Sequence, residues 1–283
     1  MNATSGPTDV PRTIYHYTSQ AGLLGIIHDK ALWVSSIRHL NDSAELSYAI
    51  SMLKGGLDSP WPDFDVDDSA DPLTELWVMF REGVLKQLEV LENSDSHVGS
   101  FSQERDQLSQ WRAYTSGEVG FSIGFNLGML KSFAEAQHFE LLRCTYETSE
   151  HRILVSQLLN EAQKMLDKKG EHGVDEAVIR CVRDFMRFAP RFKHPSFKEE
   201  KEWRLFKTVE MEEPAKFRIG KSMLVPYGEF DFEDEYNNTP VVEIVIGPTP
   251  HMALSKASVE RLLVTSDMGH VAVIESSVPF RNW

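Results

Sequence analysis

The segment Thr13-Ile-Tyr-His-Tyr-Thr-Ser19 decides how the fold of this chain is predicted, and the remaining elements follow outward from it. Its period-two pattern predicts a short strand over 13–17, which places Ile14 and His16 on one face. The hydroxyl residues at its end can cap a short helix, in which apolar residues recur at helical spacing. A strand, a capped turn and a helix are therefore the first elements that the sequence predicts.

Beyond this segment, the predicted helices and strands indicate a mixed α+β fold. A capping box at Asp42 and Glu45 predicts a helix that begins there. Further helices are expected over 71–91, 106–114, 149–169, 175–189 and 255–263, and strands over 32–35, 98–102, 119–125, 202–206, 223–225, 241–246 and 271–274. A loop rich in aspartate is expected over 55–71. The helices at about 148–190 separate two strand-rich segments. We therefore expect residues 1–283 to form a single α+β domain with an acidic loop and a helical insertion.

The composition indicates a folded protein that does not coat nucleic acid. Of 283 residues, 41% are hydrophobic, which excludes disorder as the main state. The 29 basic and 43 acidic residues give a net charge of −14, and such a surface repels phosphate backbones on average. Two cysteines are too few for a disulfide framework. No signal-peptide pattern and no bilayer-spanning apolar run is present, so we expect a cytoplasmic protein without a membrane partner.

Several short motifs follow one another along most of the chain. They are Tyr15 to Ser19, Leu40-Asn41-Asp42 with Glu45, Ser100 to Ser102, Leu108 to Tyr114, Gly120 to Phe125, Phe197 with Glu199 to Arg204, and Ile246-Gly247-Pro248. In this order they resemble an uncharacterised bacterial family, the domain of unknown function 2971. That family name carries no activity, so the function has to come from the residues.

Three of these motifs also follow the order of a catalytic triad. A strand carries His16 and Thr18, a second strand leads through Ser102 into a helix with Tyr114, and a third strand begins with Glu202. This order resembles the ADP-ribosyltransferases that use a His-Tyr-Glu triad. The resemblance implies an ADP-ribosyltransferase-like fold, in which the core is a split mixed β-sheet and the helices at about 148–190 are an addition.

The resemblance further implies that NAD is the substrate and that His16, Tyr114 and Glu202 are catalytic. Cleavage of the nicotinamide–ribose bond develops an oxocarbenium ion, which a carboxylate under the sugar stabilises. Glu202 would take this role, hold the ribose 2′-hydroxyl and deprotonate the acceptor. His16 would hydrogen-bond a ribose hydroxyl, and Tyr114 would stack on the nicotinamide ring. No metal is expected, because the leaving group already carries a cationic nitrogen.

Residues around the triad are expected to complete the NAD-binding site. The full binding set comprises His16, Tyr17, Thr18, Ser102, Trp111, Arg112, Tyr114 and Arg204. Arginine suits bidentate contacts with the pyrophosphate. Tyr17 departs from the pattern of the ADP-ribosyltransferases, in which a glycine usually stands at that position. Access to the nicotinamide end of the site would therefore differ.

Each catalytic assignment has an alternative. His16 lies on an apolar strand face and can instead be a hydrogen-bonded histidine of the core. Trp111, one helical turn before Tyr114, can be the stacking residue instead. Glu202 lies in an acidic cluster at the start of its strand, and Glu200 is the substitute candidate for the catalytic acid.

Other residues offer chemistry of a different class. Asn41, Asp42 and Glu45 could ligate a metal, although a helix cap also explains their spacing. Cys144 could act as a nucleophile, but no histidine is near it in sequence. A stripe of arginines at helical spacing could bind an acceptor or a pyrophosphate, or could simply be a solvated helix face. Its members are Arg180, Arg183, Arg187 and Arg191.

The sequence therefore predicts an enzyme that transfers ADP-ribose from NAD to an unidentified acceptor, with NAD hydrolysis as a minor variant. The acceptor is a protein, a small molecule, or a nucleic acid that binds only through the arginine stripe. A role as a bacterial toxin or anti-phage effector follows by analogy with the broader group. The first alternative is a non-catalytic nucleotide-binding module of the same fold. The second is a metal-dependent hydrolase or nuclease.

Overall fold

The computed structural model describes residues 10–39, 44–58, 72–93, 95–115, 118–209, 216–220 and 222–279. These residues form a ten-stranded sheet whose strands, in chain order, are β1 (Thr13–Ser19), β2 (Ala31–Ser36), β3 (Asp95–Ser102), β4 (Gly120–Asn126), β5 (Glu140–Arg143), β6 (Glu202–Val209), β7 (Lys216–Ile219), β8 (Leu224–Asp231), β9 (Val241–Ile246) and β10 (Ala272–Glu275). The main path runs β10-β9-β4-β1-β3-β2-β8-β7, and β6 branches from it by pairing with β3 and β5. Only β9 and β10 pair in parallel among these strands, so the sheet is mixed.

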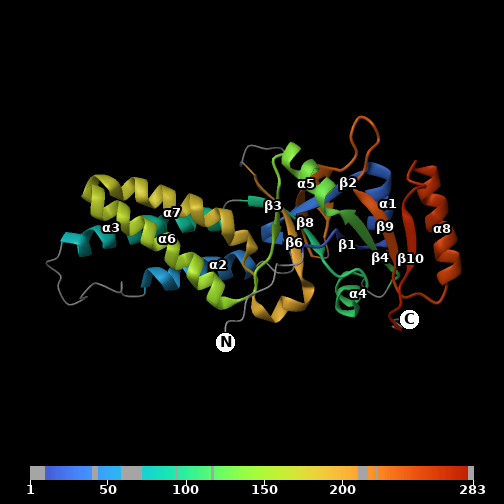
Figure 1. The fold of residues 1–283 in the computed structure, drawn as a ribbon, viewed down its shortest axis with the longest axis horizontal. Helices are drawn as coiled ribbons and strands as arrows, with labels where there is room; N and C mark the ends of the chain where they lie inside the picture. Colours follow the sequence, from blue (N-terminus) through green and yellow to red (C-terminus); the bar gives the residue numbers. More distant parts are fainter. Residues whose placement is uncertain are drawn as a thin grey trace.

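The helices fall into two groups. They are α1 (Gln20–Asp29), α2 (Ala44–Asp58), α3 (Pro72–Asn93), α4 (Leu108–Tyr114), α5 (Leu127–Ala136), α6 (Thr148–Lys169), α7 (Val174–Phe188) and α8 (Met252–Thr265). Figure 1 shows α2, α3, α6 and α7 gathered at one end of the long axis and the sheet with the other helices towards the opposite end. Each group has its own large cluster of buried apolar side chains. We call the cluster among α2, α3, α6 and α7 the helical core, and the cluster between the sheet and the other helices the sheet core.

The strands and helices predicted in the first segment are confirmed, and their local causes are visible. The Ser19 side chain accepts a hydrogen bond from the backbone N–H of Gly22 at 3.2 Å and so caps α1. In the same way Asn126 accepts from the N–H of Met129 and caps α5. The helix α5 was not among the predicted elements, and neither were the short strands β5 and β7. The mixed α+β class is confirmed.

The predicted helices at 149–169 and 175–189 are confirmed, but they do not form an addition by themselves. They pack with α2 and α3 around the helical core. On α7 the apolar residues Val178, Val182 and Phe185 are buried, as the periodicity predicts.

The prediction of a loop over 55–71 is wrong at its start, because α2 continues to Asp58. Gly56 lies within the last turn of this helix, and a Cβ at its position would lie 2.7 Å from a methyl group of Val155. The glycine lets α2 approach α6 closely, so it serves packing rather than chain reversal. Residues 59–71 lie outside the described part of the chain.

The sheet opens between β1 and β3. The register of these two fully described strands consists of the single pair Tyr15 and Ser102. From there β1 continues alongside β4, with seven paired residues, while β3 continues alongside β6, with eight. The two halves of the sheet therefore separate beyond Tyr15, and a space opens between them.

Within the described residues, no helix combines the length and the apolar character that crossing a membrane requires.

Candidate functional site

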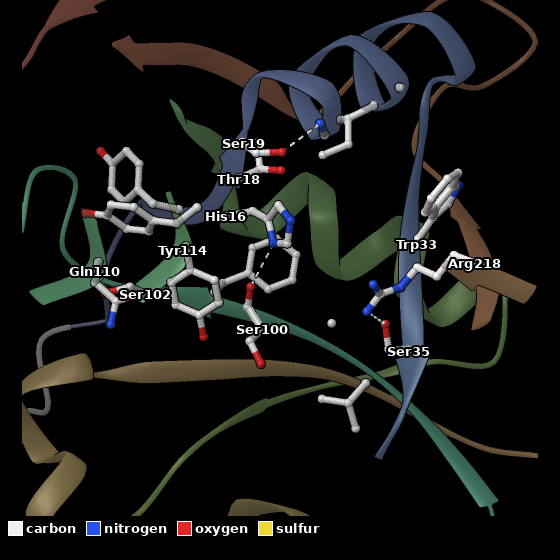
Figure 2. A pocket seen from close by; sticks show the side chains of 18 of the residues that line it. His16, Thr18, Ser19, Trp33, Ser35, Ser100, Ser102, Gln110, Tyr114 and Arg218 are labelled. Carbon is white, nitrogen blue, oxygen red and sulfur yellow. Dashed lines mark hydrogen bonds between the residues drawn. The ribbon is translucent and has the colours of Figure 1, made fainter. Parts of the chain in front are cut away.

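A cavity of about 760 Å³ occupies the space between β1 and β3. Its walls come from β1, the first two turns of α1, β2, β3, α4 and β7, together with residues between 193 and 202. Small residues of α1, namely Ala21, Gly22 and Gly25, leave the helix side of the cavity open. Its size lies within the range of about 300–1,000 Å³ typical of ligand sites. Figure 2 shows side chains that point into it from both halves of the sheet.

His16 lines the cavity from β1 and is held in one tautomer. Its Nδ1 lies 2.9 Å from the carbonyl oxygen of Ser100, so Nδ1 carries the proton and donates it (Figure 2). Burial lowers the pKa of His16 below its ordinary value, and the hydrogen bond to Ser100 opposes this shift only in part. The imidazole is therefore neutral near pH 7, and its Nε2 is a hydrogen-bond acceptor.

Glu202 begins β6 and lies at the same level of the sheet as Ser102 of β3 and Tyr15 of β1. Only 5% of its surface is exposed, and its carboxylate is bound by two cations. Arg204 donates from Nε to Oε1 at 3.1 Å and from Nη2 to Oε2 at 3.2 Å, and the ammonium group of Lys193 also binds Oε2. Burial alone would raise the pKa of Glu202, but the positive charges of Arg204 and Lys193 outweigh it and lower the pKa to about 2.

Glu200 also lines the cavity, and it shares the cation of Glu202. Lys193 Nζ lies 2.5 Å from Oε2 of Glu200, and the lysine is only 2% exposed. The two glutamates converge on one ammonium group because Lys201 between them has a left-handed backbone, with φ 44° and ψ 50°. This turn redirects the chain just before β6. The sequence alternative of Glu200 is thus adjacent to Glu202 in space and is the more exposed of the two, with 22% of its side chain accessible.

Tyr114 and Trp111 have different surroundings. Tyr114, at the end of α4, is 43% exposed and lines the cavity (Figure 2). Trp111 is 1% exposed, and its indole N–H donates to Asp106 Oδ1 at 2.8 Å. Its ring packs edge-on against Tyr17 at a centroid distance of 4.7 Å. Trp111 does not line the cavity, so Tyr114 is the aromatic ring of this helix that a ligand can reach.

The other predicted binding residues divide between the cavity and the rest of the molecule. Tyr17, Thr18 and Ser102 line the cavity. The Tyr17 hydroxyl donates to the carbonyl oxygen of Glu104 at 2.7 Å, which ties the end of β1 to the loop after β3.

The two arginines of the predicted NAD-binding set do not line the cavity. Arg112 is exposed on α4. Arg204 is 2% exposed, and besides Glu202 it binds the carbonyl oxygen of Pro190 at 2.9 Å. The position of Arg204 thus indicates that it orients Glu202.

Sequence reasoning missed several cavity residues. Lys193 lies in an irregular segment with no periodic pattern, and Gln110 was hidden among the residues of α4. Trp33 and Ser35 belong to a predicted strand but formed no motif. Arg218 belongs to β7, which was not predicted. The sequence offers one indication for Lys193, namely its positive charge a few residues before the glutamate cluster.

The alternatives of other chemical classes gain no support from the described residues. Asn41 and Asp42, and the side chain of Glu45, lie outside them. Within the described ranges, no group of three or more His, Cys, Asp or Glu side chains is arranged to hold a metal ion. Cys144 is buried and does not line the cavity.

The arginine stripe lies on the helical side of the molecule. Arg180, Arg183 and Arg187 are exposed on α7, and all three approach the carboxylate of Asp184, at 3.6, 3.1 and 3.8 Å. Arg191 follows α7 and donates to the carbonyl oxygen of Arg143 at 3.2 Å. None of the four lines the cavity.

Comparisons with known proteins relate part of the chain to a protein family. No curated protein and no solved structure gives a significant match to the chain. The motifs before residue 110 and after residue 205 that resemble this family lie outside the matched part. Residues 110–205, which include Tyr114, Lys193 and Glu202, match the model of a protein family of unknown function, DUF2971.

Proposed function

We propose that this protein transfers ADP-ribose from NAD to an acceptor. The observation that supports the proposal most strongly is the common location of His16, Tyr114 and Glu202. These residues come from three distant segments, yet all of them line one cavity at the opening of the sheet. The separation of β1 from β3 supports the interpretation of this sheet as the split core of an ADP-ribosyltransferase-like fold.

The proposed reaction needs an ionised carboxylate close to the reacting sugar. The bond between ribose C1′ and the nicotinamide nitrogen breaks, and its electron pair passes to the nitrogen, so that neutral nicotinamide leaves. The acceptor then forms a bond to C1′ and loses a proton to solvent. Positive charge develops on the ribose between these two events, and a fixed negative charge stabilises it.

The surroundings of Glu202 fit the electrostatic part of this task. Its pKa of about 2 keeps the carboxylate ionised at every pH near neutrality, which also makes it a weak base. We therefore assign Glu202 to charge stabilisation rather than to removal of the proton from the acceptor. His16 offers Nε2 as an acceptor for a ribose hydroxyl, and Tyr114 offers an exposed ring for the nicotinamide.

A second candidate is a nucleotide-binding module without turnover, and one observation favours it. Both carboxylate oxygens of Glu202 already accept hydrogen bonds from cations. Oε1 accepts from Arg204, and Oε2 accepts from Lys193 and Arg204. Each contact occupies a lone pair that a ribose would otherwise use. A cavity with this arrangement can bind a dinucleotide while the glycosidic bond stays intact.

A test uses the full chain, NAD labelled in its adenosine half, a bacterial lysate and EDTA. Nicotinamide release and transfer of label are followed for the wild type, for Glu202→Gln and for Glu161→Gln. Glu161 is an exposed carboxylate on α6 and serves as the matched control. We expect EDTA-resistant transfer by the wild type and by Glu161→Gln, and its loss in Glu202→Gln.

The other outcomes separate the candidates. Nicotinamide release without a labelled product would identify water as the acceptor. NAD binding without release would favour the binding module. Activity that EDTA abolishes would contradict the metal-free reaction, and absence of NAD binding would overturn both candidates.

A further inference from the structure

The cavity has two chemically different ends. Figure 2 shows Tyr114, Gln110 and Ser102 at one end, and Trp33, Ser35 and Arg218 at the other. His16 and Ser100 lie between them (Figure 2). The first end contains the residues assigned above to the reaction, whereas the second has no assigned role.

The second end is built on one face of a three-stranded part of the sheet. Ser35 of β2 pairs with Tyr227 of β8, which in turn pairs with Lys216 of β7. Side chains two residues apart on a strand share a face, so Trp33 and Arg218 are on the same face as Ser35. Trp33 stacks on Tyr227 at a centroid distance of 4.6 Å, which fixes the plane of the indole, and 44% of Trp33 remains exposed.

Arg218 differs in its partners from the other cations near the cavity. It is partly buried, and its Nη2 donates to Ser35 Oγ at 3.0 Å. Within the described residues no carboxylate forms an ion pair with it. In contrast, Lys193 is bound by two glutamates, and Lys216 on the same strand lies 2.5 Å from Glu229. Among the described residues, Arg218 thus presents to the cavity a positive charge that no carboxylate pairs with, in a protein whose net charge is −14.

We propose that Arg218, Ser35 and Trp33 bind the adenosine diphosphate part of the ligand. A guanidinium group binds phosphate oxygens in a bidentate manner, and partial burial strengthens the attraction because water screens it less. An exposed indole of fixed orientation stacks on a purine base. This end therefore takes the diphosphate at Arg218 and the adenine at Trp33.

The direction in which NAD would lie in the cavity rests on the proposed function. With the diphosphate at Arg218, the second ribose of NAD extends past His16 towards Tyr114 and Glu202. That direction brings C1′ to the carboxylate and the nicotinamide to the exposed tyrosine ring. The affinity for ADP, however, requires no turnover and can be measured separately.

The experiment measures the binding of ADP to the full chain by titration calorimetry. Arg218→Gln should bind ADP about ten to a hundred times more weakly, the range expected when one charge-assisted contact is lost. Arg218→Lys should lose less, because it keeps the charge without the planar fork. The matched control is Arg187→Gln, which alters an exposed arginine on α7 and should leave affinity unchanged.

Two simpler probes assign the parts of the subsite. Arg218→Gln should weaken the binding of inorganic pyrophosphate and spare adenosine, and Trp33→Leu should do the reverse. Circular dichroism checks that each variant is folded. Equal ADP affinity in the wild type and Arg218→Gln, or no ADP binding by the wild type, would overturn the proposal. Arg218-dependent ADP binding without any nicotinamide release would support the subsite and refute the proposed transfer reaction.

Discussion

Replacing Lys193 with methionine is expected to lower the free energy of unfolding by about 3 kcal/mol. Breaking a buried ion pair by removing one partner typically costs about 3–5 kcal/mol, because the other charge stays buried. Here Glu202 would keep its two contacts with Arg204, and Glu200 is partly accessible to water. Both facts place the loss at the lower end of that range.

The measurement is urea unfolding of Lys193→Met and of a matched control, Lys198→Met. Lys198 also pairs with a glutamate, at 2.5 Å from Glu147, but both side chains are exposed, and the control should change little. The pair of variants thus isolates the effect of burial. Equal destabilisation of the two variants would refute the reasoning.

The loss in Lys193→Met should also depend on pH with a definite sign. The pKa of Glu202 is about 2 in the folded protein, against 4.5 in the unfolded chain. Its ionic contacts therefore contribute stability above pH 4.5, and this contribution disappears as the pH falls towards 2. The wild type and Lys193→Met should become more alike in stability over that interval. A difference that stays constant with pH would show that lost packing, not lost charge, is responsible.

Three other perturbations have predictable results in the same unfolding assay. Burial lowers the pKa of His16 and of His151, so below pH 6.5 the unfolded chain binds protons that the folded chain does not. The free energy of unfolding should therefore fall between pH 7.5 and 5.5. A free energy that does not change over this interval would contradict the reasoning. Asp106→Ala removes the acceptor of the buried Trp111 indole and should cost about 1–3 kcal/mol; a neutral result would show that water replaces the carboxylate. Gly55→Ala should stabilise the protein by about 0.4–1 kcal/mol, because nothing lies within 4 Å of the new Cβ. Gly56→Ala should destabilise it, because the new Cβ would lie too close to Val155. A more stable Gly56→Ala than Gly55→Ala would disprove the packing argument.

The sequence predicts those parts of the fold whose cause is local. The strand with His16 and the cap at Ser19 depend on neighbouring residues, and both are confirmed. The last turn of α2 packs against a distant helix. In the sequence Gly56 is typical of a loop, and only its close contact with Val155 in the structure shows that it serves helix packing. The prediction therefore fails where a long-range contact decides the structure.

The same distinction applies to the candidate site. His16, Tyr114 and Glu202 could be proposed from motif order, but their approach to one cavity depends on how the sheet opens. The strand β7 has only four residues and forms because it pairs with β8, so Arg218 could not be found from a local pattern. The convergence of Glu200 and Glu202 depends on a left-handed lysine, a conformation that sequence rarely indicates.

The segment that carries Lys193 gives the molecule a property that neither core has alone. Phe192 is fully buried in the helical core, where its ring stacks on His151 at a centroid distance of 4.1 Å, and the next residue, Lys193, lines the cavity. Two consecutive residues thus connect the interior of the helices to the carboxylates at the start of β6. We therefore expect the helices and the sheet to unfold as one cooperative unit, so that chemical denaturation proceeds as one transition instead of two. A nucleotide held in the cavity would then slow amide exchange in α7, although no part of that helix touches it.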